Sequence, residues 1–458
     1  MQSGGLGFWW RSVGGPPPPR PPLAGRAEAD VAIVGAGYTG LWTAYYLARA
    51  RPDLRIVVLE REIAGFGASG RNAGWVSGFF SGPSRAYIAR SGHAAHVALM
   101  RAMFATVDEI GSVIAENSID ADFLKSGRLS VALGSAQEVR LRGEVGAARE
   151  LGLHEEDLRL LTGRELARRI RIPGARAASF SPHVARVHPA KLLTGLAAAV
   201  ERLGVLIHEG TAVSEIRPHE ALTSAGSVSA RWVVRATEGY TASLAGLRRA
   251  LVPMNSSMII TEPLTAEAWS QIGWEASELL GDEANVYAYL QRTADGRIAI
   301  GGRGIPYRYG SRTDGAGSTA RSTVSQLHAR LLAMFPPAAG ARIEHAWSGV
   351  LGVPRDWCVS VDADPASGLA RAGGYVGEGV AASNLAGRIL SDLILGERSE
   401  LTRLPWVGRS PARWEPEPLR WASVRGVYAL YRAADRMERR TGRPSPLARL
   451  VDTASGRG

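Results

Sequence analysis

The sequence predicts an α/β fold, and three observations lead to that prediction. A strand, a helix and a second strand follow one another between residues 29 and 60, with the glycine-rich turn GAGYTG after the first strand. A second glycine-rich segment, GFGASGRNAG, begins at residue 65, and a third, GGYVGEGVAASNLAG, begins at residue 373. Alternating strands and helices are typical of a parallel sheet covered by helices. The closely spaced glycine segments indicate a long, phosphate-bearing ligand that lies along the backbone.

Length and composition favour a globular protein of two domains. The chain has 458 residues, of which 45% are hydrophobic and 21% charged, and its net charge is +11. No lysine- and arginine-rich tract alternates with aromatic residues, so we expect no nucleic-acid partner. A single cysteine, Cys358, excludes an internal disulfide. We find no signal-peptide pattern and no apolar run long enough to span a bilayer, and we therefore expect a cytoplasmic protein.

The first 27 residues predict an extended N-terminal arm. The tract GGPPPPRPPLAG within them is incompatible with a helix or a central strand, because proline lacks a backbone N–H and has a fixed φ angle. Phe8, Trp9 and Trp10 precede this tract and are candidates for docking on the body of the protein.

The first turn has the spacing of a dinucleotide-binding fingerprint. Gly35 permits the tight turn, Gly37 lets the backbone approach a pyrophosphate, and Gly40 lets the helix pack on the strand. Glu60 ends the second strand about twenty residues after Gly40, where a carboxylate can accept hydrogen bonds from ribose hydroxyls. A carboxylate there would repel the 2′-phosphate of NADP. The expected ligand contacts of this Rossmann-type unit are Gly35, Ala36, Gly37, Tyr38, Thr39, Gly40, Glu60 and Arg61.

The second glycine segment bears on the choice between NAD and FAD. It follows Glu60 closely, where a simple NAD domain would enter its next helix. Its small residues let the backbone reach a second part of the ligand, and Arg71 can meet a phosphate charge. The expected contacts in this segment are Gly67, Ala68, Ser69, Arg71, Asn72, Ala73, Gly74 and Trp75.

Periodicity predicts further elements along the chain. They are helices at 41–50, 95–117, 137–151 and 191–203, strands at 55–59, 205–208 and 231–236, two strands within 286–303 joined by a turn at Asp295-Gly296, a helix that ends at Leu395, and a helix at 423–440. The last of these lies in a tail rich in tryptophan, arginine and proline. Its basic amphipathic pattern suits a membrane surface, a partner subunit or the body of the protein, and we favour packing on protein.

The three glycine segments in this order resemble the D-amino-acid oxidase-like (DAO) family of FAD-dependent oxidoreductases, most closely its gamma-glutamylputrescine oxidase-like members. The segment ATEGY at 236–240 is similar to the family's Ala-Thr-Asn-Gly-Tyr, with Glu238 in place of the amide. The resemblance covers about residues 29–396. It implies a Rossmann-type FAD-binding domain of discontinuous segments plus an antiparallel-sheet substrate domain. Further FAD contacts implied by the resemblance are Val213, Thr237, Gly239, Tyr240, Gly349, Gly374, Gly377, Gly379 and Val380.

The resemblance also implies domain boundaries and an activity. The N-terminal arm is 1–27, the FAD-binding domain 28–90, 186–250 and 345–398, the substrate domain 91–185 and 251–344, and the basic C-terminal extension 399–458. The implied reaction oxidises a C–N bond of an amine or amino acid by hydride transfer to flavin, followed by imine hydrolysis. Oxygen or another acceptor then takes the electrons. A flavoprotein of related fold that acts in tRNA modification, or as a non-oxidase partner subunit, is the alternative.

The sequence departs from the family at two places. No lysine lies in the segment 297–303, where sarcosine-oxidising members carry one. The sequence therefore leaves open whether the enzyme is an oxidase or a dehydrogenase. No cysteine or histidine stands where some members attach flavin, so we expect non-covalent FAD. The catalytic residue stays unknown, and His188 can be a base or a structural residue. The substrate-site candidates are Trp75, Tyr287, Tyr289 and Arg303, each of which can instead serve packing or structure.

Overall fold

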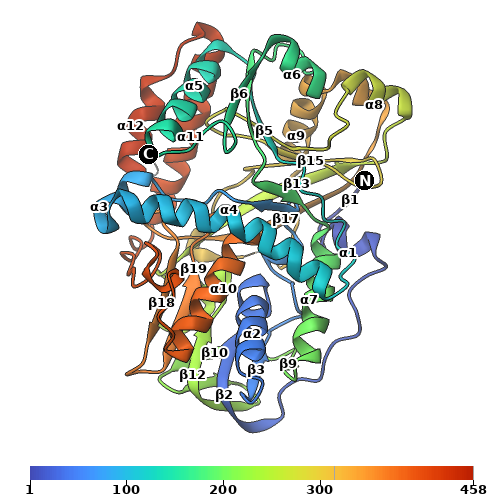
Figure 1. The fold of residues 1–458 in the computed structure, drawn as a ribbon. Coiled ribbons are helices and arrows are strands. Elements are labelled where there is room, and N and C mark those ends of the chain that lie inside the picture. Colours follow the sequence, from blue (N-terminus) through green and yellow to red (C-terminus); the bar gives the residue numbers. More distant parts are fainter. Residues whose placement is uncertain (314, 457–458) are drawn as a thin grey trace.

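The computed structural model describes residues 1–313 and 315–456, and it confirms the mixed α/β fold. Within these residues the chain forms an eight-stranded sheet and a nine-stranded sheet, with a small two-stranded sheet beside them. The eight-stranded sheet lies in the lower half of Figure 1 and the nine-stranded sheet in the upper half. The long helix α4 (His93–Glu116) crosses between the two halves.

The lower sheet is built around parallel strands. β2 (Gly25–Val34) lies between β3 (Ile56–Leu59) and β12 (Gly226–Arg235), and all three are parallel. β3 is a short apolar run, Ile-Val-Val-Leu, and its four residues are all buried, as expected where both faces of a sheet are covered. The remaining strands are β9 (Leu206–His208), β10 (Val213–Arg217), β11 (Glu220–Thr223), β18 (Ser360–Asp364) and β19 (Leu369–Gly373).

Helices α2 (Tyr38–Ala50), α7 (Pro189–Arg202) and α10 (Gly379–Leu395) pack beside the lower sheet. α2 and α10 approach so closely that a Cβ on Gly387 would lie 2.9 Å from the backbone of Trp42 and Thr43. The predicted helices 95–117, 137–151 and 191–203 are confirmed as α4, α5 (Ser135–Glu150) and α7.

The upper sheet is mainly antiparallel. Its strand order is β1 (Gln2–Ser3), β17 (Ile343–Val353), β13 (Val252–Thr261), β16 (Ile298–Gly302), β15 (Tyr289–Arg292), β14 (Leu279–Asp282), β5 (Arg128–Ala132), β7 (Ala177–Ser181) and β6 (Arg159–Thr162). The small sheet pairs β4 (Trp75–Ser77) with β8 (Val184–Arg186). Helices α3 (Ser84–Ser91), α6 (Gly163–Arg169), α8 (Ala266–Ile272) and α9 (Arg321–Met334) also lie in the central part of the chain.

Strand β17 differs from the expected division of the chain. The sequence placed residues 345–398 with the nucleotide-binding segments, but β17 pairs with β13 in the upper sheet as far as Val353. The segment enters the lower sheet only at β18 and β19. A strand that runs from one domain towards the other gives no composition signal at the crossing point, because both of its faces are buried.

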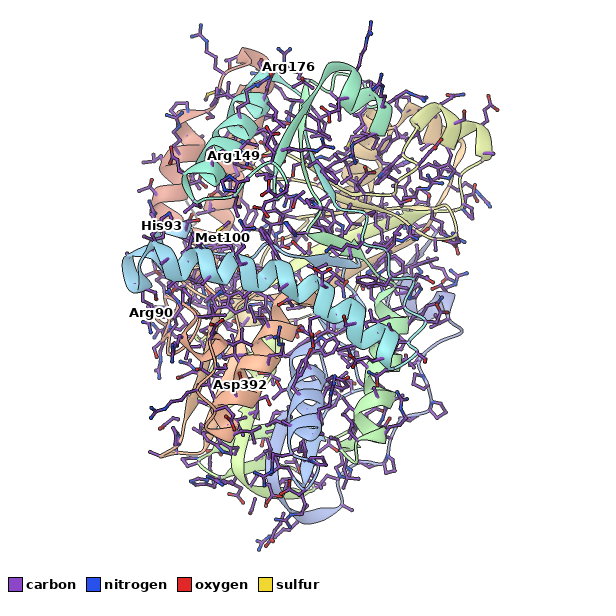
Figure 2. All side chains as sticks on the ribbon, in the orientation of Figure 1. Arg90, His93, Met100, Arg149, Arg176 and Asp392 are labelled. Atoms are coloured by element: carbon purple, nitrogen blue, oxygen red, sulfur yellow. The ribbon has the colours of Figure 1, made fainter. Side chains whose placement is uncertain are left out.

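Helix α4 supplies side chains to both halves of the molecule. Leu99, Met103, Val107 and Ile110 are buried in the large core that includes α2 and α10. Met100 lies on another side of the helix and packs in a separate cluster with Phe104 and Leu153, towards α5 (Figure 2). The three- and four-residue spacing that predicted this helix therefore corresponds to a helix buried on more than one face.

The N-terminal arm docks on the body. Phe8, Trp9 and Trp10 lie in the short helix α1 (Phe8–Ser12), and all three are buried, as expected. β1 pairs in parallel with β17, so the arm adds a strand to the edge of the upper sheet. Only the proline-rich part between Pro16 and Ala24 has the predicted form without helix, strand or turn.

The C-terminal extension contains two helices where the sequence predicted one. α11 (Leu419–Thr441) includes the predicted helix, and α12 (Pro446–Ser455) follows it. Pro446 occupies the first turn of α12, where proline is favoured because its missing N–H has no helical partner. Val424, Tyr428 and Tyr431 of α11 are buried against the body, so the favoured packing on protein is confirmed. Among the described helices, none is long and apolar enough to cross a membrane.

Candidate active site

Two cavities meet between the sheets. The first, here the dinucleotide cavity, lies at the carboxyl ends of β2 and β3 and at the first turn of α2. The second, here the chamber, lies against the upper sheet and includes residues of β13 and β15. Five residues line both cavities, and they are Ala68, Asn72, Leu351, Gly377 and Val380. A ligand that fills the dinucleotide cavity therefore has a path to the chamber.

The glycines of the first turn leave space that a side chain would fill. Gly35 has a φ of +107°, and a Cβ on it would lie 2.7 Å from the carbonyl oxygen of Ala236. A Cβ on Gly40 would lie 1.9 Å from the carbonyl oxygen of Gly35, so this glycine allows α2 to pack on its own strand. Gly37 is the N-cap of α2, and a Cβ there would lie 2.9 Å from Ser69 Oγ. The turn thus presents the helix N-terminus to the cavity, as anion binding requires.

Glu60 closes the far side of the dinucleotide cavity. Its carboxylate accepts hydrogen bonds from the backbone N–H of Ala36 at 2.8 Å and of Glu62 at 3.0 Å. Burial raises the pKa of Glu60 above its ordinary value. A carboxylate has about four lone-pair sites, so two remain for hydroxyl donors of a ligand. Arg61 stacks over the ring of Tyr240 at 5.0 Å, and both residues line the cavity.

The second glycine segment folds back on the first. Ser69 Oγ accepts a hydrogen bond of 2.9 Å from the backbone N–H of Tyr38, and Asn72 Oδ1 accepts one of 2.7 Å from the N–H of Gly74. Trp9 of the arm donates its indole N–H to the carbonyl of Asn72 at 2.7 Å. The N-terminal arm therefore supports the loop that lies between the two cavities.

Arg71 is buried within the second glycine segment. Its side chain is buried, it donates to the carbonyl of Gly315 at 3.0 Å, and its guanidinium stacks over Phe66 at 4.5 Å. It lines the chamber and not the dinucleotide cavity. Phe66 itself lines the dinucleotide cavity, so the contact of Arg71 with a cofactor phosphate stays a prediction.

The third glycine segment is held by Glu238. This buried carboxylate accepts hydrogen bonds of 2.9 Å from the backbone N–H groups of both Gly374 and Tyr375. Burial raises the pKa of Glu238 to about 7, although these two N–H groups favour its ionised form. Gly352 must be glycine here, since a Cβ on it would lie 1.9 Å from the Glu238 carboxylate. The segment then leads through Gly377 into α10.

Most of the predicted cofactor residues line the dinucleotide cavity. They are Gly35, Gly37, Tyr38, Thr39, Glu60, Arg61, Gly67, Ala68, Ser69, Asn72, Val213, Thr237, Gly239, Tyr240, Gly377, Gly379 and Val380. Ala73, Trp75 and Gly349 line the chamber instead. Four predicted residues line neither cavity and instead allow the backbone of the turns to adopt its shape. They are Ala36, Gly40, Gly74 and Gly374.

Sequence reasoning missed other residues of the dinucleotide cavity. They are Val34, Leu59, Phe66, Thr211, Ala236, Glu238, Ser243, Leu244, Val350, Leu351, Gly352, Tyr375, Val376 and Ser383. Several of these adjoin predicted residues, as Val350 adjoins Gly349 and Tyr375 adjoins Gly374. Position next to a glycine turn was the available signal, but it does not tell which side chains face the ligand.

The four substrate-site candidates come together in the chamber. Trp75, Tyr287, Tyr289 and Arg303 all line it. The rings of Trp75 and Tyr289 meet edge to face, with centroids 6.4 Å apart. Tyr289 shares a hydrogen bond of 2.6 Å with Ser256 Oγ, and burial raises its pKa to about 12. Arg303 reaches the carbonyl of Val376 at 3.5 Å, in the third glycine segment.

The chamber also holds charged residues that the sequence did not identify. Glu144, Glu283 and Glu378 line it together with Arg128. Burial, followed by repulsion from Glu144, raises the pKa of Glu283. The three acids come from a helix, a loop and the third glycine segment, and Arg128 comes from β5, so no local pattern connects them. Within the described residues, no cluster of side chains is suited to hold a metal ion.

Two other candidate residues have structural roles. His188 is the N-cap of α7, where its Nδ1 accepts the backbone N–H of Lys191 at 3.3 Å, and it lines neither cavity. Cys358 is buried, and burial raises the pKa of its thiol to about 11. A thiol with so high a pKa is a poor nucleophile, as expected for an inert core residue.

Known proteins resemble this chain over most of its length. Residues 30–393 match the family model described as FAD dependent oxidoreductase (DAO). The probable oxidoreductase OrdL of Haemophilus influenzae is 29% identical over 401 residues, which cover 83% of this chain and 86% of that protein. The gamma-glutamylputrescine oxidoreductase of Escherichia coli is 29% identical over 379 residues, which cover 80% of this chain and 84% of that protein.

The fold also matches a solved structure. Glycine oxidase from Geobacillus kaustophilus superposes with a TM-score of 0.69 at 21% identity, over 83% of this chain and 98% of that one. The resemblance stated from the glycine segments is therefore confirmed by both sequence and fold.

Proposed function

Because the chain belongs to the family of FAD-dependent oxidoreductases, we propose that it oxidises the C–N single bond of an amine or an amino acid. FAD held in the dinucleotide cavity would supply the hydride acceptor for the carbon beside the nitrogen, and hydrolysis of the imine product by water would follow. The names of two similar proteins, a gamma-glutamylputrescine oxidoreductase and a glycine oxidase, support this class of substrate. The cytoplasmic location expected from the sequence stays a prediction.

The residues of the dinucleotide cavity fit FAD. The glycine cradle at Gly35 and Gly37 and the first turn of α2 suit the pyrophosphate, since no side chain occupies that space. Glu60 suits the ribose hydroxyls, because its carboxylate keeps lone pairs beyond those used by the backbone. We propose that FAD is held without a covalent bond, since the buried Cys358 thiol lies outside the cavity lining.

One observation supports the proposal most strongly, namely the five residues that line both cavities. A ligand bound in the first cavity can present one end to the chamber. The aromatic faces of Trp75 and Tyr289, together with the carboxylates of the chamber, suit a cationic amine. Arg303 suits a substrate carboxylate. The electron acceptor is oxygen or another molecule, and both stay open.

Two measurements test the proposal. Acid denaturation of the purified protein should release free FAD. Anaerobic reduction of the bound flavin should then be followed with glycine, N-methylglycine, 1,4-diaminobutane, gamma-glutamylputrescine and lactate. We expect reduction by at least one of the nitrogen compounds and none by lactate. Reduction by lactate alone would overturn the amine assignment and leave the FAD assignment intact.

A further inference from the structure

The C-terminal helices form one wall of the chamber. Tyr431 from α11 and Asp452 from α12 line it, together with Trp75, Tyr287 and Tyr289. Both helices lie in the upper part of the molecule beside α5, away from the lower sheet (Figure 1). They also lie outside residues 30–393, the part that matches the family model. The chamber of this chain thus has a wall that the matched region does not supply.

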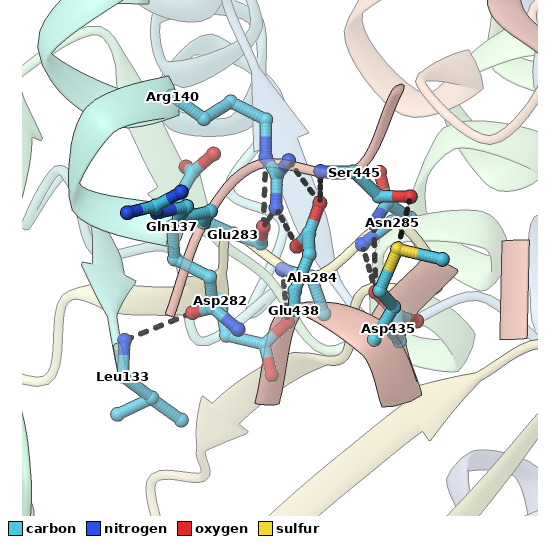
Figure 3. A network of polar contacts seen from close by, with 12 residues as sticks. Leu133, Gln137, Arg140, Asp282, Glu283, Ala284, Asn285, Asp435, Glu438 and Ser445 are labelled. Carbon is cyan, nitrogen blue, oxygen red and sulfur yellow. Dashed lines mark hydrogen bonds and ion pairs between the residues drawn. The ribbon is translucent and has the colours of Figure 1, made fainter. Parts of the chain in front are cut away.

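Polar contacts fasten α11 to the upper domain. Arg140 of α5 binds both carboxylate oxygens of Glu438, at 3.2 and 3.0 Å, and also donates to the carbonyl of Glu283 (Figure 3). The carboxylate of Glu438 accepts the backbone N–H of Ser445 at 3.0 Å, which fixes the turn into α12. Bidentate guanidinium–carboxylate pairs constrain geometry as well as distance. The position of α12 is therefore set from α5.

Helix α11 also positions the loop that carries Glu283 and Tyr287. One oxygen of Asp435 accepts the backbone and side-chain N–H groups of Asn285, at 2.8 and 2.9 Å, and the other accepts the N–H of Val286 at 3.1 Å (Figure 3). The C-terminal extension thus shapes the chamber in two ways. It supplies two lining side chains and holds a loop that supplies four more lining residues, Glu283, Ala284, Asn285 and Tyr287.

The lining of the chamber has one more carboxyl group than it has guanidinium groups. Asp282 is paired with Arg330, and Arg140 is paired with Glu438. The other charged residues that line the chamber are the acids Glu144, Glu283, Glu378 and Asp452 and the bases Arg71, Arg128 and Arg303. Asp452 accepts a hydrogen bond of 2.5 Å from the hydroxyl of Tyr431, whose side chain is 1% exposed. The Asp452 carboxylate is thereby fixed at the edge of the cavity.

We propose that the Tyr431–Asp452 pair determines substrate specificity by binding a second ammonium group, at the end of the substrate remote from the reacting C–N bond. This inference rests on the proposed function for the reacting end. A carboxylate that is oriented by a buried tyrosine loses little entropy when it pairs with a cation, and the aromatic wall excludes competing water. The substrate class is a diamine, or an amine with a second cationic group.

Matched pairs of monoamines and diamines test the inference. The holoenzyme is titrated without oxygen with butylamine and 1,4-diaminobutane, and with pentylamine and 1,5-diaminopentane. Flavin absorbance reports binding before any reduction, and reduction is followed separately. For the wild type we expect one diamine to bind at least about ten times more tightly than its monoamine, because a charged partner is gained. In Asp452→Asn this preference should disappear while monoamine binding stays unchanged.

Control variants separate specificity from folding. Leu430→Ala and Thr453→Ala change exposed neighbours of the pair and should keep the diamine preference. Tyr431→Phe keeps the ring, removes the hydroxyl and should weaken the preference in the same direction as Asp452→Asn. If Asp452→Asn lowers the melting temperature, Tyr431→Phe provides the test. Equal binding of monoamine and diamine by the wild type, or an unchanged preference in both variants, would overturn the inference.

The same titration distinguishes the two proposals. A diamine preference in binding that depends on Asp452, without reduction by any amine, would support the inference and contradict the proposed reaction. Reduction by amines without such a preference would support the reaction and contradict the role of the pair.

Discussion

The carboxylate of Glu238 accepts a 2.9 Å hydrogen bond from the backbone N–H of Gly374, and this contact joins the end of β12 to the segment before α10. The same oxygen accepts the N–H of Tyr375 at 2.9 Å. Glu238 stands where the resembling family has an amide. Arg235 attracts its negative charge, but burial is the larger effect and raises its pKa to about 7.

Glu238→Gln should change how stability depends on pH. Folded Glu238 keeps its proton up to about pH 7, whereas the unfolded chain releases it near the ordinary value of 4.5. The free energy of unfolding of the wild type therefore falls as pH rises through this window and is level above it. Relative to that of the wild type, the free energy of unfolding of Glu238→Gln should therefore rise by on the order of 1–3 kcal/mol between pH 5 and pH 8.

Urea denaturation at several pH values measures this difference. Glu397→Gln is the matched control, because Glu397 is exposed and should show no pH-dependent difference from the wild type. Parallel stability profiles for Glu238→Gln and the wild type would mean that Glu238 ionises at its ordinary pKa in the folded protein.

Gly37→Val should abolish FAD binding. Even a Cβ at this position lies 2.9 Å from Ser69 Oγ, and a branched side chain would occupy the cradle at the start of α2. Gly143→Val is the control, since nothing lies within 4 Å of a Cβ on Gly143. The ratio of flavin to protein absorbance in the two purified variants gives the answer. A yellow Gly37→Val protein with full flavin content would contradict the assignment of this turn to the pyrophosphate.

Arg303→Ala should separate amino-acid substrates from simple amines. The guanidinium lines the chamber near the third glycine segment, where a substrate carboxylate can pair with it. Loss of such a pair costs about 2–5 kcal/mol, or roughly 30-fold and more in the Michaelis constant of an amino acid. Amines without a carboxylate should show no increase. An unchanged constant for every amino acid, with an unaltered flavin spectrum, would assign Arg303 a structural role.

Trp9→Ala should destabilise the protein and weaken FAD binding. The indole donates to the carbonyl of Asn72, and its ring packs edge to face on Trp347 with centroids 5.9 Å apart. Removal of a buried tryptophan side chain costs about 3–5 kcal/mol. The loss of support at Asn72 should also raise the dissociation constant of FAD, measured by fluorescence titration of the stripped protein. Val13→Ala, at an exposed position of the same arm, should change neither quantity.

The sequence by itself determined the nucleotide-binding half of this protein. The turn at 35–40, the acid at Glu60 and the loop at 65–74 are local patterns, since strand, turn and helix are specified by residues close together in the chain. α4, α5 and α7 were predicted for the same reason, because the spacing of apolar residues within one helix shows which face is buried.

Only the tertiary structure decided how the chamber is built. Glu283, Glu378 and Tyr431 come from three distant segments, and nothing in any one segment indicates the others. The direction of Arg71, the membership of β17 in the upper sheet and the contact of α12 with α11 depend on long-range packing. A local pattern fixes backbone geometry, whereas the side chains that face a cavity are selected by which elements meet there. The cofactor could therefore be predicted from the sequence, whereas the shape and charge of the substrate site could not.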